Sequence, residues 1–248
     1  MQWANAQAYE RFMWRWSQIA GHKFLTWLCL PVRQRWLEVG CGTGSFSQAI
    51  LEASRPEELV CLDPSEELLS EARGRFGKGQ VIVLPGDAMC LPFGEPSFDV
   101  AVSGLVLNFV PDERRMVSEM KRVVRNGGCI ASYVWDFHGG RSVTQHIGQA
   151  LGELDPMHVE AALAAQRAET TSLAALTRLF EDNGLVSVRT TSADVEICFG
   201  SFEEYWLSNT AFASPHARQL AVLDPVDRAE VRDRVRASLP YSSDGKIE

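Results

Sequence analysis

The fold of this 248-residue chain is decided by the stretch Trp36-Leu37-Glu38-Val39-Gly40-Cys41-Gly42-Thr43-Gly44. A short apolar run ends here at three alternate glycines, and Phe46, Ala49 and Ile50 then share one face of a helical repeat. Alternate glycines permit unusual backbone angles and let a ligand approach the main chain without a Cβ in the way. The stretch predicts a β-strand that is joined directly to a helix by a ligand-binding turn.

The same alternation continues along the chain. Short apolar runs end at Gly, Asp or Pro and are separated by segments with helical spacing; the runs are residues 36–39, 59–62, 81–84, 98–103, 129–135 and 185–191. Near-continuous apolar strands that alternate with helices indicate a parallel sheet covered on both faces, with right-handed crossovers. We therefore predict an α/β fold with a doubly wound, mostly parallel sheet of six strands.

Two segments break this alternation. Residues 139–178 and 200–240 have amphipathic helical spacing, and helices inserted there are placed to cap the end of the sheet at which open α/β folds bind ligands. We predict a single domain over residues 1–248, with a helical lid at 1–30, a ligand-binding core at 31–136 and the two helical insertions as its cap.

Composition excludes several classes of protein. The 24 Lys and Arg residues against 32 Asp and Glu residues give a net charge of −8, which does not suit binding to a phosphate backbone, so no nucleic-acid partner is expected. No run of 18 apolar residues and no signal-peptide pattern appears, which predicts a cytoplasmic protein without a membrane partner. The six cysteines form no zinc-spaced cluster, so no metal is expected, and the oligomeric state stays open.

Two further acids follow predicted strands. Asp63 comes 19 residues after Gly44, where a carboxylate can accept hydrogen bonds from both ribose hydroxyls or can cap the next helix. Asp87, after the third strand, can accept from an adenine amine, although alone it is also an ordinary turn residue. Glu38 precedes the first glycine by two residues, where it would repel a pyrophosphate and attract a cation. A nucleoside cofactor is predicted, with dinucleotides still allowed at this point.

Taken in order, these segments resemble the successive motifs of class I S-adenosylmethionine-dependent methyltransferases, at residues 36–44, 59–65, 81–91, 98–111 and 125–136. The similarity covers about residues 9–136 and is to the subgroup with small-molecule acceptors, which includes the quinone-biosynthesis methyltransferases. It implies a Rossmann-like fold and S-adenosylmethionine as the cofactor.

The resemblance also implies which residues bind the cofactor. The glycines would lie under its methionyl part with Glu38 near the ammonium and sulfonium end, Asp63 would hold the ribose, and the segment from Asp87 would hold the adenine. Tyr9 and Arg15 of the N-terminal helix are candidates for the cofactor carboxylate, although a core stripe explains the aromatic residues of this helix equally well. The full set is Tyr9, Arg15, Glu38, Gly40, Cys41, Gly42, Gly44, Asp63, Pro64, Ser65, Asp87, Ala88, Met89 and Ser103.

Methyl transfer by in-line displacement needs alignment and exclusion of water more than a dedicated base. Where the acceptor must lose a proton, His138 and Asp136 after the fifth strand are the first candidates, and His146 is the second. Several residues either line an acceptor pocket or pack the cap onto the sheet: Asn108, Phe109, Trp135, Phe137, Tyr205 and Trp206.

Two other functions stay open. A non-catalytic S-adenosylmethionine-binding protein would keep the same pocket, and an NAD-dependent oxidoreductase shares the sheet and Asp63. The glycine spacing and Gly86-Asp87-Ala88 count against the oxidoreductase. The family's antiparallel seventh strand would begin near residues 245–248, where the sequence stops, so we expect either a clipped sequence or a differently built sheet edge.

Overall fold

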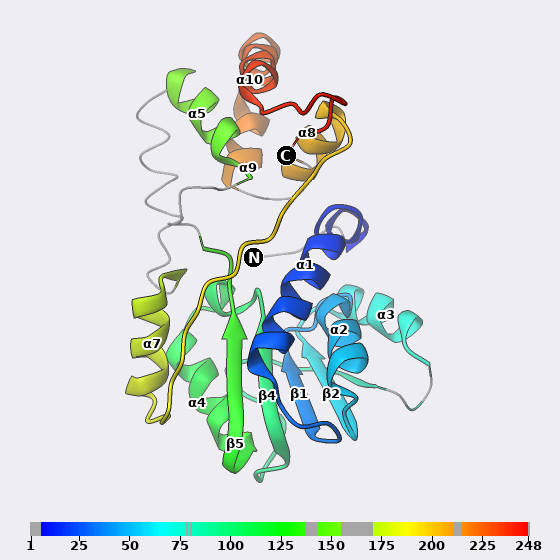
Figure 1. Ribbon diagram of the computed structural model, residues 1–248, viewed down its shortest axis with the longest axis vertical. Helices are drawn as coiled ribbons and strands as arrows, with labels where there is room; N and C mark the ends of the chain where they lie inside the picture. Colours follow the sequence, from blue (N-terminus) through cyan, green and yellow to red (C-terminus); the bar gives the residue numbers. More distant parts are fainter. Residues whose placement is uncertain are drawn as a thin grey trace. The chain divides into compact units, whose positions relative to one another are not determined.

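A computed structural model describes residues 6–77, 79, 81–136, 143–154, 171–210 and 215–247, and the side chains of residues 6–13, 15 and 215 lie outside the description. The described residues fall into two compact units (Figure 1). Of the described residues, the sheet unit contains those at 14–77, 79, 81–135 and 171–194, and the helical unit contains those at 6–13, 136, 143–154, 195–210 and 215–247. The arrangement of a single domain with a lid and cap stays a prediction.

The sheet unit is built on five parallel strands in the order β3-β2-β1-β4-β5. Their bounds are β1 Arg35–Val39, β2 Glu58–Asp63, β3 Ile82–Pro85, β4 Phe98–Gly104 and β5 Val124–Tyr133. Every neighbouring pair is parallel, so the carboxyl ends of all the strands lie at one edge. The strand order reverses at β1, between β2 and β4, which is the position where doubly wound folds bind ligands. The prediction of a doubly wound, parallel α/β sheet is confirmed.

Helices cover both faces of this sheet (Figure 1). They are α1 Ala6–Leu28, α2 Ser45–Ser54, α3 Glu66–Arg75, the short 3-10 helix η1 Leu107–Phe109, α4 Glu113–Val123 and α7 Leu173–Asp182. Alternate residues of β1 enter different cores: Trp36 packs with α1 and α2, while Leu37 packs with α4 and α7. A strand that is buried on both faces explains why residues 36–39 read as an unbroken apolar run.

The sixth predicted strand, residues 185–191, is wrong. These described residues contain no strand, and Val186 is 88% exposed. Leu185 and Val188 pack against the core cluster on the α4 side, but the hydrogen bonds of this segment go to α7: the Leu185 amide donates to the Phe180 carbonyl at 3.2 Å. Apolar spacing therefore identified the contacts of the segment correctly and its backbone pairing incorrectly.

The helical unit contains α5 Gln145–Leu154, α8 Phe202–Thr210, α9 Pro215–Val222 and α10 Pro225–Ser238. Buried apolar residues of α5 and α10, including Ile147, Val231 and Val235, supply part of its core. Near the end of the chain, Ile247 forms an antiparallel bridge with Phe199 through backbone hydrogen bonds of 2.9 and 3.0 Å. The last described residues thus pair within the helical unit and add no strand to the sheet.

We expect Met120→Ala to lower the free energy of unfolding by about 2–5 kcal/mol, because Met120 is fully buried under the sheet and truncation leaves a cavity. Ser118→Ala, on the exposed face of the same helix, is the control and should change stability by less than about 0.5 kcal/mol. Urea unfolding of the two variants measures the difference, and equal stabilities would contradict this packing.

Candidate functional site

The glycine turn after β1 is held against the end of β2. The amides of Gly40 and Cys41 both donate to the Leu62 carbonyl, at 2.7 and 2.8 Å, and the Gly44 amide donates to the Cys41 carbonyl at 2.9 Å. The three glycines have φ values of +80°, +55° and +90°. Left-handed backbone at three alternate positions explains why the chain places glycine at each of them.

The three glycines differ in what surrounds them. A Cβ at Gly40 would meet the Val106 side chain at 2.4 Å, and one at Gly44 would meet the Phe76 ring at 2.7 Å. A Cβ at Gly42 would meet nothing within 4 Å. Gly40 and Gly44 are therefore required by packing as well as by backbone angle, whereas Gly42 borders open space at the carboxyl edge of the sheet.

Asp63 connects this turn to the end of β2. Its side chain is almost fully buried, with one oxygen accepting from the Gly42 amide at 2.9 Å and the other from the Ser65 amide at 2.9 Å. Burial raises the pKa of Asp63, while the two amide hydrogen bonds lower it. The helix N-cap is Ser65, which accepts from the Leu68 amide, so the alternative role of Asp63 as that cap is wrong. Each Asp63 oxygen keeps a further lone pair for a ligand.

Glu38 lies beneath the glycine turn and is 1% exposed. Its carboxyl group accepts a hydrogen bond from the Ser47 hydroxyl, and the Cys61 thiol lies 3.6 Å away. Burial is the largest cause of a pKa raised to about 7, and the Ser47 and Cys61 hydrogen bonds act in the opposite direction. The described surroundings place no cation within ion-pair distance of this carboxyl group.

The third acid shapes a turn after β3. One oxygen of Asp87 accepts from the Met89 amide at 2.8 Å, and the Asp87 carbonyl accepts from the Cys90 amide at 3.0 Å. The Gly86 amide donates to the Asp63 carbonyl at 3.1 Å, so this turn begins beside the end of β2. Asp87 itself is exposed, which leaves its second oxygen available at the same edge.

Ser103, at the end of β4, is fully buried. Its hydroxyl has no hydrogen-bond partner among the described residues, and the same holds for the Thr43 hydroxyl in the glycine turn and the Asn108 side-chain oxygen in η1. Buried polar atoms normally have partners. A polar ligand bound at this edge of the sheet would supply hydrogen-bond partners for these three oxygens.

The structure brings together the predicted residues that follow β1, β2, β3 and β4. The side chain of Cys41 is buried in the core cluster that contains α1 and α2, so only its backbone belongs to the turn. Pro64 and Ala88 lie beside Asp63 and Asp87 in the two turns, with Pro64 exposed. His138 and the side chains of Tyr9 and Arg15 lie outside the described residues, and Asp136 is an exposed residue of the helical unit.

Sequence reasoning missed residues that support the site from behind. Ser47, the hydrogen-bond donor to Glu38, gave no signal beyond its place in the first turn of α2. Arg75 donates from Nε to the Thr43 carbonyl at 3.3 Å, and its guanidinium lies 3.7 Å from the centre of the Trp14 ring. This contact joins α3, the glycine turn and α1, elements that are distant in sequence.

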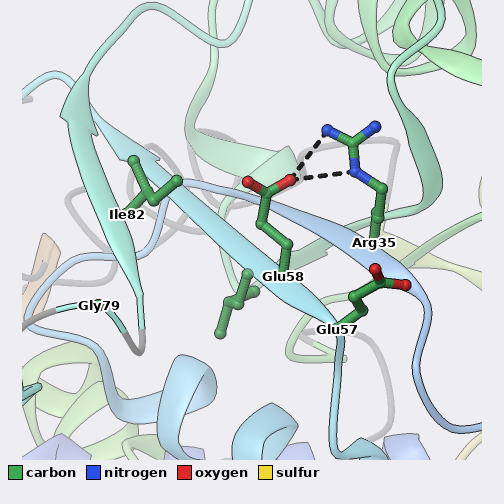
Figure 2. Close-up of a pocket in the computed structure, with 6 residues that line it drawn as sticks. Arg35, Glu57, Glu58, Gly79 and Ile82 are labelled. Carbon is green, nitrogen blue, oxygen red and sulfur yellow. Dashed lines mark hydrogen bonds and ion pairs between the residues drawn. The ribbon is translucent and has the colours of Figure 1, made fainter.

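A separate hollow of about 370 Å³ lies at the opposite edge of the sheet. Figure 2 shows it at the amino ends of β1, β2 and β3, where Arg35 forms an ion pair with Glu58 at 2.9 Å. Ligands of parallel sheets bind at the carboxyl ends of strands, and none of the predicted site residues lines this hollow. We therefore assign the candidate site to the glycine turn and the three acids.

Comparison with known proteins identifies the family of the chain. Residues 37–132 match a family model described as a methyltransferase domain. The demethylmenaquinone methyltransferase of Bacillus velezensis is 32% identical over 166 residues, which cover 62% of this chain and 71% of the relative. That of Geobacillus kaustophilus is 40% identical over 99 residues, but this match spans 42% of the relative and 38% of this chain.

Solved structures show the same fold. A Thermotoga maritima protein described as an S-adenosylmethionine-dependent methyltransferase is 25% identical, with a TM-score of 0.50 over 71% of this chain and 79% of that one. The YcgJ protein of Bacillus subtilis has a TM-score of 0.54 at 18% identity, over 93% of each chain. The chain belongs to the class I S-adenosylmethionine-dependent methyltransferase family, and it is a methyltransferase.

Two kinds of feature are absent from the described residues. No group of three or more His, Cys, Asp or Glu side chains within them has the arrangement to hold a metal ion. None of their helices is both long and apolar enough to cross a membrane.

We expect Glu38 to make stability depend on pH. Between the usual pKa of 4.5 and about 7 the unfolded chain releases this proton while the folded protein keeps it, so stability falls as pH rises; above about 7 both states are ionised and the loss is complete. The difference corresponds to about 3 kcal/mol. Denaturant unfolding of wild type and Glu38→Gln between pH 4.5 and 8 should show a steeper decline in the wild type than in the variant, which keeps only the contribution of other groups such as Asp63.

The control is Glu66→Gln, which changes a carboxyl group that is 69% exposed and paired with Arg73. Its stability should follow the wild-type pH curve. Parallel curves for wild type and Glu38→Gln would contradict a raised pKa at this carboxyl group.

Proposed function

We propose that this methyltransferase transfers a methyl group from S-adenosylmethionine to a small organic acceptor by in-line displacement. The observation that supports this proposal best is the hydrogen bond from the Gly42 amide to the Asp63 carboxylate. Gly42 has left-handed backbone and open space where a Cβ would lie. The turn offers main-chain contact to the ligand at one end, and the acid offers hydroxyl recognition next to it.

The residues present fit this cofactor. Gly40 to Gly44 would lie under the methionyl part, the free lone pairs of Asp63 would accept from the ribose hydroxyls, and Asp87 with the Ala88 amide would bind the adenine edge. The unpaired hydroxyls of Ser103 and Thr43 supply further polar contacts. Glu38 would lie beneath the positively charged end, where ionisation of its buried carboxyl group balances that charge. Tyr9 and Arg15 stay candidates for the cofactor carboxylate.

When bound, the cofactor supplies an electrophilic methyl group on a positively charged sulfur. Held by the glycine turn and Asp63, the cofactor would supply its methyl to an acceptor lone pair, and the sulfur would keep the electrons of the broken carbon–sulfur bond. The site contributes alignment of the two reactants and exclusion of water, effects worth up to about 7–11 kcal/mol in well-oriented reactions. An acceptor that carries a proton must also lose it, and we propose His138, with Asp136, for that role.

A reduced quinone ring is the acceptor class that we would test first. Relatives of two kinds carry such names. They are the demethylmenaquinone methyltransferases and a rice protein named 2-methyl-6-phytyl-1,4-hydroquinone methyltransferase 2, which is 37% identical over 94 residues. The rice match covers 38% of this chain and 27% of the relative, so it supports a class of acceptor and no particular compound.

The cofactor is tested by calorimetric titration with S-adenosylmethionine, S-adenosylhomocysteine and NAD. We expect micromolar binding of both sulfur compounds and none of NAD, with at least about a tenfold loss in Asp63→Ala because a ribose contact to a charged group is removed. Gly42→Ala should also abolish binding, since its methyl group enters the open space, while it lowers stability by only about 1–2 kcal/mol.

Wild-type binding of NAD in place of the sulfur compounds would favour an oxidoreductase, and full binding by Gly42→Ala would contradict the placement of the ligand. Binding of S-adenosylmethionine without turnover on any acceptor would favour a non-catalytic binding protein.

The proposed base is tested with His138→Gln and Asp136→Ala on a hydroquinone acceptor. A general base contributes about 10²–10⁴-fold, so kcat should fall by that order in His138→Gln. His22→Gln is the control, because His22 is no candidate for the base and its Nε2 atom lies 3.2 Å from the Glu52 carboxylate. Unchanged turnover in both test variants would exclude these residues from catalysis.

A further inference from the structure

Helix α4 holds the segment that follows the Asp87 turn. The Glu119 side chain is 6% exposed and accepts from the Leu91 amide at 2.9 Å. It also accepts from both Nε and Nη2 of Arg122, at 2.9 and 2.6 Å. The Arg122 hydrogen bonds are the largest cause of a lowered pKa at Glu119, which is therefore a carboxylate at neutral pH. The result is a bidentate pair between a buried carboxylate and a guanidinium that is 39% exposed, bound directly to loop backbone.

Two arginines of α4 also donate hydrogen bonds to the backbone of residues 89–93. Arg122 donates to the Leu91 carbonyl at 3.0 Å and also to the Phe93 carbonyl. Arg115, one turn before Glu119, donates from Nε to the Met89 carbonyl at 3.1 Å. Backbone groups at three positions between residues 89 and 93 are thus bound by side chains of one helix.

The Asp87 turn has few other constraints. At its start the Gly86 amide is bound by the Asp63 carbonyl, and β3, to which it is attached, is a four-residue edge strand. The only regular pairing after β3 in this described segment is the single bridge between Asp87 and Cys90. The position of Asp87 relative to Asp63 is therefore set by Gly86 on one side and by the α4 side chains on the other.

We propose that Glu119, together with Arg122, is a positioning residue that sets the discrimination for adenine at the candidate cofactor site. The inference rests on the proposed function. Glu119 would affect adenine binding indirectly, because it positions Leu91 and with it the Asp87 turn. It would not contact the ligand itself. A bidentate carboxylate–guanidinium pair fixes the relative geometry of its two side chains. Recognition of an exocyclic amine by a turn requires such a fixed geometry.

The test compares two ligands that differ only at the base: S-adenosylhomocysteine and S-inosylhomocysteine, in which an oxygen replaces the exocyclic amine. Calorimetry on the wild type should show at least about a tenfold preference for the adenine compound, because Asp87 accepts from the amine. In Glu119→Gln this preference should fall at least about threefold, through weaker binding of the adenine compound and unchanged binding of the hypoxanthine one. The KM for S-adenosylmethionine should rise with kcat at saturation unchanged.

Two more variants complete the design. Arg122→Lys keeps the charge but loses the bidentate geometry, and it should lower the preference in the same direction, so it carries the test if Glu119→Gln does not fold. Asp182→Asn is the matched control. It removes an exposed carboxylate of α7 that pairs at 2.6 Å with Arg114 of α4, the helix that also carries Glu119 and Arg122. Its preference should equal that of the wild type.

Each outcome has a distinct meaning. An unchanged preference in Glu119→Gln and Arg122→Lys, or equal weakening of both ligands, would overturn the inference and leave Glu119 with a role in stability alone. Failure of the wild type to bind either ligand would overturn the proposed function, and the inference with it.

Discussion

The hydrogen bond from the Gly42 amide to the Asp63 carboxylate is the interaction on which the rest of the site depends. It joins the turn after β1 to the end of β2, and the same aspartate binds the Ser65 amide at the start of α3. The Asp63 carbonyl also accepts from Gly86, at the end of β3. One residue therefore aligns three strand ends, and any ligand bound at the glycine turn meets the acids in a preset geometry.

Two of the acids at this edge of the sheet are buried and have no basic partner among the described residues. Glu38 and Asp63 are both buried acids with raised pKa values, and no base in their described surroundings neutralises them. Keeping an acid in such a place is costly unless it has a partner when the protein works. A ligand with a positively charged sulfur and ammonium group supplies one, which is why these acids fit the proposed cofactor better than a dinucleotide with its negative pyrophosphate.

Much of the sheet and part of the site could be predicted, because burial leaves a signal in the sequence. The same signal explains why a strand was wrongly predicted at residues 185–191. The runs at residues 36–39, 59–62 and 98–103 are buried on both faces, so a continuous apolar signal corresponds to a central parallel strand. Leu185 and Val188 give a similar signal because they pack on the core, yet they form no strand, and the Leu185 amide donates to the Phe180 carbonyl of α7. Hydrophobic spacing reports burial, and it does not report which backbone groups are paired.

The sequence by itself determined the class of fold and the glycine turn, and it singled out Glu38, Asp63 and Asp87 as candidate ligand-binding acids. These features depend on local spacing and on what glycine and carboxylates can do at a strand end. Only the tertiary structure decided that Ser47 binds Glu38, that Arg75 joins Trp14 to the glycine turn, and that Glu119 and Arg122 hold the Asp87 turn. Those contacts join residues 9 to 61 positions apart, and their geometry exists only once the parallel strands bring the loops to one edge.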